Sequence, residues 1–189
     1  MKFDTDHRLI VGCASSIFLL LSIFIAVLPA LEAEKTPALA GIERLNEEAA
    51  LGREIYLQEG CGVCHTQFVR ALPVDAQYGR GSLAGDYAFE DPPLLGTQRT
   101  GPDLSNVGAR QPSDVWNLIH LFNPRAVVPN SVMPAYPWLF TLKSKAQGTD
   151  IIVSVPPQYN PDGAVIVANR EAIALVRYLQ TLKQVEVTP

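Results

Sequence analysis

The pattern of hydrophobic and polar positions separates an apolar N-terminal stretch from a longer region of mixed character. Residues 9–31 are 23 consecutive positions without a charged side chain. As a helix, such a run would be about 35 Å long, which is enough to cross a hydrocarbon core of about 30 Å. The pattern therefore predicts a single transmembrane anchor over residues 9–31, between a short N-terminal segment, residues 1–8, and a tether, residues 32–41.

A cleaved signal peptide is the alternative interpretation of this stretch. The apolar region of a signal peptide is usually about 7–15 residues long, which is shorter than this run. Lys2 and Arg8 precede the run, and an excess of Lys and Arg favours the cytoplasmic side. We therefore expect residues 1–8 to stay in the cytoplasm and the chain beyond the anchor to be exported.

Three amphipathic helices are predicted in the exported region. In each of them, apolar residues recur every three or four positions, which is the helical period. Ser113 and Asn169 immediately precede the second and third helices and are typical N-cap residues. The missing side chain of Gly52 is expected to permit a close crossing of the first helix with the last. The predicted ranges are residues 43–59, about 113–122 and 170–183.

Two β-prone segments lie between the last two helices. Residues 151–155 and 164–168 flank a loop rich in Pro, Asn and Gly, so we expect them to pair as a small hairpin. The hairpin would belong to an insertion, residues 141–168, within a domain that covers residues 42–189. The predicted fold is therefore mainly α, with one N-terminal transmembrane helix followed by a helical domain that has long loops and a small β-hairpin insertion.

Composition narrows the possible functions. The chain has 189 residues, a net charge of -4, 48% hydrophobic residues and 18% charged residues. The acidic balance argues against a nucleic-acid-binding protein, which normally presents a basic face. The hydrophobic content is too high for a disordered chain, and only one stretch is apolar enough to span a membrane. Metal chemistry has to draw on three Cys, three His and two Met.

The sequence Cys61-Gly62-Val63-Cys64-His65 is the C-x-x-C-H motif by which c-type haem is attached. This spacing lets the two thiols bond to the two vinyl groups of one porphyrin. The histidine that follows is then held beneath the iron as an axial ligand. One covalently attached haem c is therefore predicted, bound by Cys61, Cys64 and His65.

Three other interpretations of the motif are open. A dithiol redox site also uses C-x-x-C, but usually within a βαβ unit, which the pattern does not predict. A zinc site needs four ligands, and the adjacent Cys64 and His65 would be hard to place on one tetrahedron. A disulfide between Cys61 and Cys64 is the interpretation that needs no cofactor.

The second axial ligand is predicted to be Met133, which is the only methionine besides the initiator. Pro129, Pro134 and Pro137 stiffen the loop around it, and a stiff loop can hold a weak thioether ligand. His120 is the competitor for this position. On its helix it lies off the apolar face, so we expect it to point away from a buried haem, as a surface or hydrogen-bonding residue.

Ligation of the iron by His65 and Met133 would fill both axial positions and raise the reduction potential. An iron without an open position is suited to electron transfer, so the chain is not expected to be catalytic by itself. A gas-binding sensor or a peroxidase-like haem protein is the alternative, and either one would need an open position on the iron.

Four further residues are predicted to support the haem. Arg99, Arg110 and Arg125 lie in loops near the motifs and could form paired hydrogen bonds with the two propionates. The segment of Pro102 could bring a backbone carbonyl to the free ring nitrogen of His65 and so fix its tautomer.

Four blocks of sequence carry a resemblance to a known family. They read GREIY…EGCGVCHTQ from Gly52, YG…SLAG from Tyr78, RTGPDL…VG from Arg99, and HL…NPR…VP…SVMP…YPW from His120. Together with the N-terminal anchor, they resemble the mono-haem cytochrome c subunit (subunit II, the "O" subunit) of cbb3-type haem-copper oxidases. The resemblance covers about residues 50–140.

The resemblance implies a class I-like cytochrome c domain with His65 and Met133 as axial ligands. It implies that the chain relays electrons from a donor cytochrome c or a cytochrome bc1-type complex to a large polytopic subunit that carries the haem-copper centre. It also implies a single-pass protein of the bacterial inner membrane with its haem domain on the periplasmic side. The related cytochrome c subunit of nitric oxide reductase and a free-standing membrane-tethered electron shuttle are the alternatives.

Overall fold

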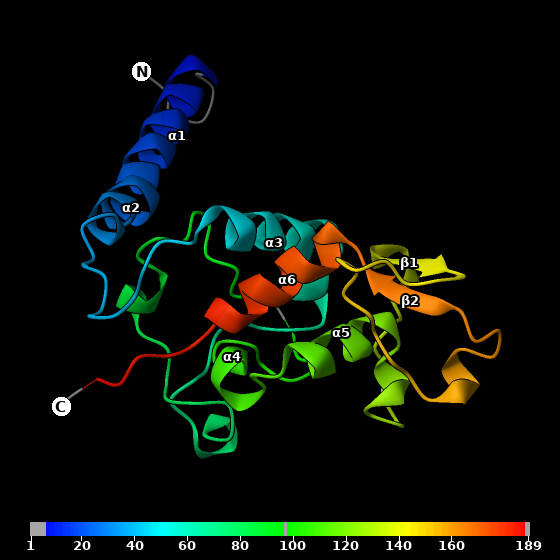
Figure 1. Cartoon of the computed structure of the whole chain (residues 1–189). Coiled ribbons are helices and arrows are strands. Elements are labelled where there is room, and N and C mark those ends of the chain that lie inside the picture. The colour runs from blue at the N-terminus through cyan, green and yellow to red at the C-terminus, as the bar shows by residue number, and fades with distance from the viewer. Residues whose placement is uncertain (1–6, 97, 188–189) are drawn as a thin grey trace. The chain divides into compact units, whose positions relative to one another are not determined.

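The computed structural model describes residues 7–96 and 98–187 of the chain. The chain divides into two compact units (Figure 1). The first unit comprises Met1–Ala40 together with Leu83–Ala88, and the second comprises Gly41–Ser82 together with Phe89–Pro189. The candidate chemistry predicted from the sequence lies in the second unit.

The first unit is built around one long apolar helix. It consists of α1 (His7–Ser22), a π-helical turn (Ile23–Val27) and α2 (Leu28–Ala33). Pro29 has no N–H and cannot continue the α-helical ladder, and just before it the N–H of Leu28 bonds to the carbonyl of Ile23, five residues back.

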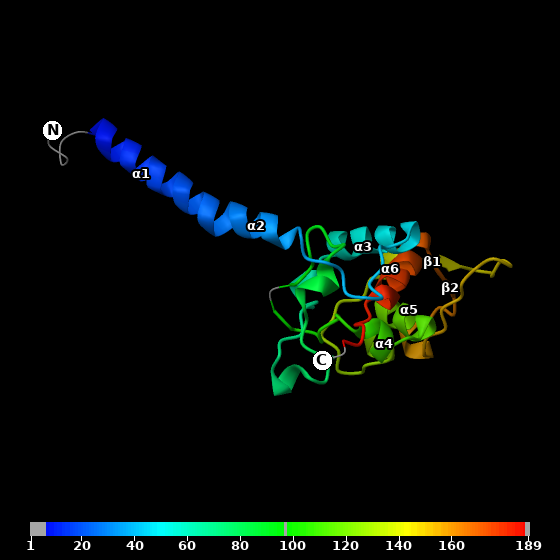
Figure 2. The same cartoon turned by 90° about the vertical axis from the view of Figure 1, so that its left-hand side faces the viewer.

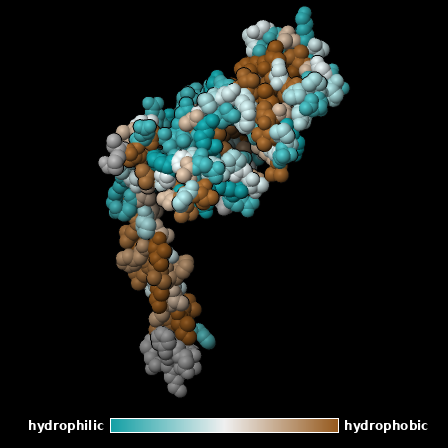
Figure 3. All heavy atoms as spheres, turned by 90° about the horizontal axis from the view of Figure 1, so that it is seen from below, coloured by the Kyte–Doolittle hydropathy of each residue, from teal (hydrophilic) through white to brown (hydrophobic). Residues whose placement is uncertain are grey.

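This helix has the length and composition of a membrane span. Its most apolar window has a mean hydropathy of 2.6, and none of that window is buried. Apolar side chains cover the part of the helix that is visible in Figure 3. The helix is therefore a candidate membrane span. The anchor assigned to residues 9–31 stays a prediction, and residues 1–6 of the expected cytoplasmic segment lie outside the described residues.

The second unit contains four α-helices among its described residues. The first begins at Glu47, four residues later than the expected start at residue 43, because Asn46 is extended and its Oδ1 accepts a hydrogen bond from Ala49 N at 2.9 Å. Ser113 caps its helix as expected, accepting from Trp116 N at 3.2 Å. The helices are α3 (Glu47–Gln58), α4 (Val107–Arg110), α5 (Asp114–Phe122) and α6 (Arg170–Thr181).

The crossing of α3 with α6 forms the centre of this unit (Figures 1 and 2). A Cβ built on Gly52 would lie 1.9 Å from the backbone oxygen of Ala174, so only glycine fits at the contact. Next to it, the rings of Tyr56 and Tyr178 meet edge to face with their centroids 5.5 Å apart. The close crossing predicted from Gly52 is confirmed.

The two-stranded antiparallel sheet pairs β1 (Phe140–Lys143) with β2 (Val165–Ala168). The ladder partner of β2 is thus β1, which was not predicted as a strand. The expected pairing of residues 151–155 with residues 164–168 is present as a shorter antiparallel contact along the other edge of β2. It consists of a bridge from Ile152 to Val167, with Val153 N donating to Ile166 O and Ala168 N donating to Ile151 O, each at 2.9 Å. The larger prediction is confirmed, because the structure is mostly helical with an N-terminal apolar helix and a small antiparallel hairpin.

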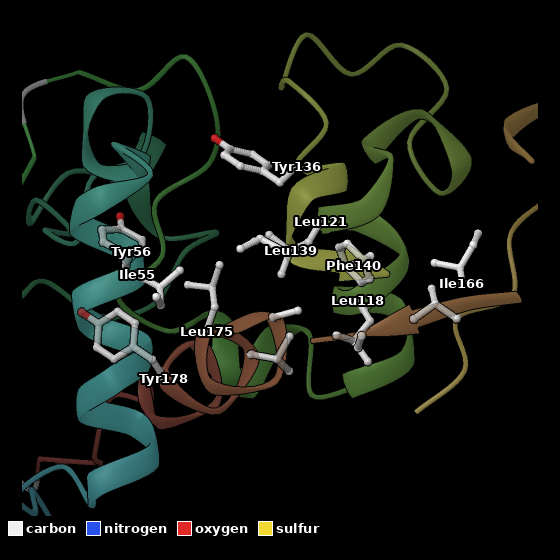
Figure 4. Close-up of a cluster of buried hydrophobic side chains, with 14 of the residues drawn as sticks. Ile55, Tyr56, Leu118, Leu121, Tyr136, Leu139, Phe140, Ile166, Leu175 and Tyr178 are labelled. Atoms are coloured by element: carbon white, nitrogen blue, oxygen red, sulfur yellow. The ribbon is translucent and has the colours of Figure 1, made fainter. Parts of the chain in front are cut away.

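The hydrophobic core of the second unit joins α3, α5 and α6 with the segment that follows residue 133 (Figure 4). Leu118 and Leu121 come from α5, and Leu175 comes from α6. Cys61 and Met133 are half-buried and pack against this same cluster. The core thus brings the C-x-x-C-H motif and the methionine loop to one body of apolar side chains.

Candidate functional site

A left-handed glycine delivers the C-x-x-C-H motif from the end of α3. Gly60 has φ +68°, a conformation that favours glycine, and it separates α3 from the short 3-10 turn Cys61–Val63. Cys61 and Cys64 are both half-buried free thiols. Burial, with a smaller contribution from the charge of Glu59, raises the pKa of the Cys61 thiol to about 12.

The imidazole of His65 is held from two sides. Its Nδ1 lies 2.8 Å from the backbone oxygen of Pro102, so Nδ1 carries the proton and donates it to that carbonyl. The backbone of Gly101 lies against the ring, where a Cβ would stand 2.9 Å from Nε2. Burial lowers the pKa of His65, which favours the neutral ring. The arrangement leaves Nε2 with its lone pair available as a metal ligand.

A buried carboxylate ties the residues after His65 to the residues after Pro102. Asp103 is fully buried, and its Oδ2 accepts a hydrogen bond from Thr66 Oγ1 at 2.6 Å and from Phe68 N at 2.8 Å. Its Oδ1 accepts from Ser105 N at 2.8 Å. We call this set of contacts the Asp103 clamp.

The predicted arginine residues have different surroundings. Arg99 donates from Nε to Thr66 Oγ1 at 2.6 Å and pairs through a second nitrogen with the buried Asp75 at 2.7 Å. Arg110 donates to the backbone oxygen of Asp103. Arg125 has an exposed side chain. Hydrogen bonds from arginine side chains hold the pKa of Asp75 far below its ordinary value.

The loop of Met133 is fixed to the C-terminal end of α5. Tyr136 N donates to Leu121 O at 2.9 Å, and Met133 N donates to Ser131 Oγ at 3.2 Å. Burial raises the pKa of Tyr136 to about 12, and the charge of Cys61 adds to the shift. In Figure 4 the ring of Tyr136 points toward α3. The methionine loop and the cysteine motif therefore face the same region of the core.

His120 differs from its expected role. Its ring stacks on Trp116 with the centroids 4.6 Å apart, and its Nδ1 is buried with no hydrogen-bond partner among the described residues. Burial, with a smaller contribution from His65, lowers the pKa of His120 to about 4. His120 is thus half-buried: it is neither fully exposed at the surface nor, at Nδ1, the hydrogen-bonding residue that was expected.

Sequence reasoning missed Thr66, Asp103, Asp75 and Tyr136. Asp103 gave a signal, because it directly follows Gly101 and Pro102 and precedes the apolar Leu104. Thr66 directly follows the C-x-x-C-H motif, in the first block of the family resemblance. Asp75 gave none, since it lies in a short turn and its burial depends on the tertiary contact with Arg99 as well as on the nearby Arg70.

The donor atoms at this site fit a porphyrin-bound iron. Among residues 7–96 and 98–187, no group of three or more His, Cys, Asp or Glu side chains is placed to hold a metal ion by itself. The site instead offers two thiols at the C-x-x-C spacing and one imidazole whose Nε2 is free. The cradle formed by Gly101, which a Cβ would fill, fixes the orientation of that imidazole.

Comparison with protein-family models matches residues 5–158, more than half of the chain. The matching model is described as "Cytochrome C oxidase, mono-heme subunit/FixO". A search of curated proteins gives no match to this chain. The matched range contains the C-x-x-C-H motif, the Asp103 clamp and Met133.

Proposed function

The chain belongs to the FixO family of mono-haem subunits of cytochrome c oxidase, and from this membership we propose its function. It is a membrane-anchored cytochrome c that transfers electrons to the catalytic subunit of a haem-copper respiratory complex of the cbb3 type. The family agrees with the resemblance to that subunit drawn from the sequence. One haem and an oxidase complex follow from the family itself.

The observation that carries the proposal is the hydrogen bonding and packing of the His65 imidazole. Its Nδ1–H is committed to Pro102 O, so Nε2 is the atom left to bind iron. Gly101 prevents the ring from turning, because the imidazole has no free space on that side. A neutral, oriented imidazole is the ligand that a haem iron needs on its proximal side.

Cys61 and Cys64 would hold the porphyrin through two thioether bonds. The turn Cys61–Val63 places these thiols directly after α3, whose position is fixed by the crossing with α6. Met133 would close the second axial position from its proline-stiffened loop. When bound, the haem supplies one-electron chemistry by alternating between ferrous and ferric iron. Two protein ligands leave no open position, which favours electron transfer over catalysis.

Arg110 and Arg125 are the more available partners for the propionates. Three nitrogens of Arg99 already bond to Thr66, Phe68 and Asp75, so a propionate there would compete with existing bonds. Arg125 keeps an exposed guanidinium group. A charged arginine near a propionate would favour the ionised carboxylate.

The candidate span His7–Ala33 would anchor the chain beside its partner. A single pass with the N-terminus in the cytoplasm would place the haem domain on the periplasmic side of a bacterial inner membrane. Electrons would arrive from a donor cytochrome c or a cytochrome bc1-type complex and leave to the large polytopic subunit. The anchor holds the two redox centres at a fixed short separation, so each transfer avoids a diffusional encounter.

The test is purification of the full chain from its native membrane in detergent. The proposal expects covalent haem on the polypeptide after denaturing electrophoresis, a spectrum typical of low-spin cytochrome c, and a large polytopic subunit in the same preparation. A copurifying nitric oxide reductase subunit would overturn the oxidase assignment. Isolation of the chain without any large subunit would favour a free-standing shuttle.

A further inference from the structure

The Asp103 clamp lies immediately behind the contact between His65 and Pro102. On one side of that contact, Gly101 N donates to Cys64 O at 3.0 Å. On the other side, Leu104 N donates to Thr66 O at 2.8 Å, and Thr66 Oγ1 donates to Asp103 at 2.6 Å. The carbonyl of Pro102 is thus held on Nδ1 of His65 by bonds at both ends of one short loop.

We infer that Asp103 is a positioning residue for the axial imidazole and that it tunes the reduction potential of the haem through His65. This inference rests on the proposed function. Asp103 makes no hydrogen bond to the imidazole or the thiols; it holds the Pro102 carbonyl through Thr66, and its negative charge also acts directly on His65. It lies 37 residues from Thr66 along the chain, so the clamp is a tertiary feature of the fold.

The chemistry of the clamp requires a carboxylate. Asp103 accepts hydrogen bonds from a hydroxyl and two backbone N–H groups, with Arg99 at 3.5 Å as a further donor. An ionised carboxylate offers acceptors only, on both oxygens. An asparagine would turn an NH2 group toward these donors, so at least one buried bond would be lost without a replacement.

The link to the haem follows from the hydrogen bond at Nδ1. A carbonyl that accepts the Nδ1–H increases the basicity of Nε2, and a more basic ligand stabilises the ferric iron. When the clamp loosens, the Pro102 carbonyl spends more time away from Nδ1. The expected consequences are faster solvent exchange of the His65 ring N–H and a higher reduction potential.

Asp75 provides a matched control within the same network. Asp75 is as buried as Asp103, and its carboxylate likewise acts as a hydrogen-bond acceptor, here for Arg70 and Arg99. Substitution of Asp75 by Asn also removes one buried negative charge, and it leaves N–H groups of Arg70 and Arg99 without their carboxylate acceptor. It removes none of the bonds that Asp103 makes to Thr66, Phe68 and Ser105, although Arg99 contacts both carboxylates. Effects that are common to both variants therefore report the stability of the network. Because the charge of Asp103 also acts on His65, exchange of the ring N–H, and not the potential alone, reports positioning.

The experiment compares Asp103→Asn and Asp75→Asn in the full-length chain, purified in detergent and reduced. Proton NMR measures exchange of the His65 ring N–H, and a redox titration measures the midpoint potential. The inference expects exchange at least about tenfold faster and a raised potential in Asp103→Asn, with exchange in Asp75→Asn within about threefold of wild type. Unchanged exchange in Asp103→Asn, or equal changes in both variants, would overturn it.

A second pair of variants covers a failure of Asp103→Asn to fold. Thr66→Val removes the hydroxyl that donates to Asp103, whereas Thr66→Ser keeps it. The inference expects faster ring N–H exchange in the valine variant and rescue in the serine variant, and equal exchange in the two would overturn it. Wild-type chain without covalent haem would defeat the proposed function, whereas an unaffected Asp103→Asn on haem-bearing protein would defeat this inference alone.

Discussion

His65 and Gly101 lie in direct contact, with the imidazole filling the space where a side chain on Gly101 would begin. A Cβ there would stand 2.3 Å from Cε1 of the ring. Protein atoms do not approach this closely, so either the ring or the backbone would have to move. The orientation of the proposed axial ligand thus depends on the absence of one methyl group, 36 residues away in the sequence.

The first prediction is that Gly101→Ala disrupts ligation by His65. The added methyl would push the ring off Pro102 O and away from its position beneath the iron. We expect less covalent haem per polypeptide, or an altered Soret band in the haem that is retained, measured by absorbance of the purified chain. Gly148→Ala is the control, because nothing lies within 4 Å of a Cβ at Gly148. Equal haem content and equal spectra in the two variants would contradict the contact.

The second prediction concerns the crossing of α3 with α6. In Gly52→Ala, the new methyl would collide with the backbone oxygen of Ala174, which cannot move away as a flexible side chain could. We expect a loss of about 3 kcal/mol or more in the free energy of unfolding. Urea titration followed by circular dichroism measures the loss. A stability within about 0.5 kcal/mol of wild type would show that the two helices can separate without cost.

The third prediction is a pH dependence that arises from His120. Burial holds its pKa at about 4 in the folded chain, against about 6.5 in an unfolded one. The unfolded chain therefore binds a proton first as the pH falls, and stability is lost between about pH 6.5 and pH 4. By linkage the loss is about 2–3 kcal/mol.

The variant His120→Gln should lose correspondingly less stability over the same pH range. Urea titrations at pH 7 and pH 4 give the comparison. His7→Gln is the control, since His7 is exposed at the start of α1, and it should follow the wild-type curve. If His120→Gln lost as much stability as wild type, the imidazole would have to be hydrated in solution.

The fourth prediction tests Met133. With both axial positions filled, the reduced wild-type chain should bind carbon monoxide poorly. Met133→Ala should open one position, so carbon monoxide should bind and shift the Soret band, as measured by difference spectroscopy. Val132→Ala is the matched control, because Val132 is 74% exposed and its truncation should change neither spectrum. Wild-type binding equal to that of Met133→Ala would remove Met133 from the ligand set.

Local signals in the sequence predicted α3, α5 and α6 of the second unit, whereas the short α4 was not predicted. Ser113 lies at the expected cap, and α6 begins at Arg170, directly after Asn169, because capping and the helical period act over a few residues. The crossing at Gly52 could also be predicted, since an apolar stripe interrupted by glycine indicates a close approach. The start of α3 was missed because Leu45 extends the apolar stripe beyond the cap at Asn46.

Features that depend on distant pairing could not be predicted. Residues 140–143 and 151–155 are both β-prone, and only the tertiary fold decides which of them forms a ladder with β2. The helical period placed His120 off the apolar face of its helix, but it does not reveal the neighbours on that side, so the partial burial of the ring was missed. The Asp103 clamp joins segments 37 residues apart, and no local pattern reveals such a contact.

The separation of 37 residues has a consequence for how the chain tolerates change. The bonds from His65 to Pro102 and from Thr66 to Asp103 close the base of a long excursion of the backbone. Doubling the length of a flexible loop costs only about 0.6 kcal/mol of closure entropy. The excursion is nevertheless anchored within its length, since Gln67 N donates to Leu95 O at 2.9 Å and Arg53 pairs with Glu90 at 2.9 Å. A tag or label inserted there would therefore have to lie between these anchored points to leave the redox centre untouched.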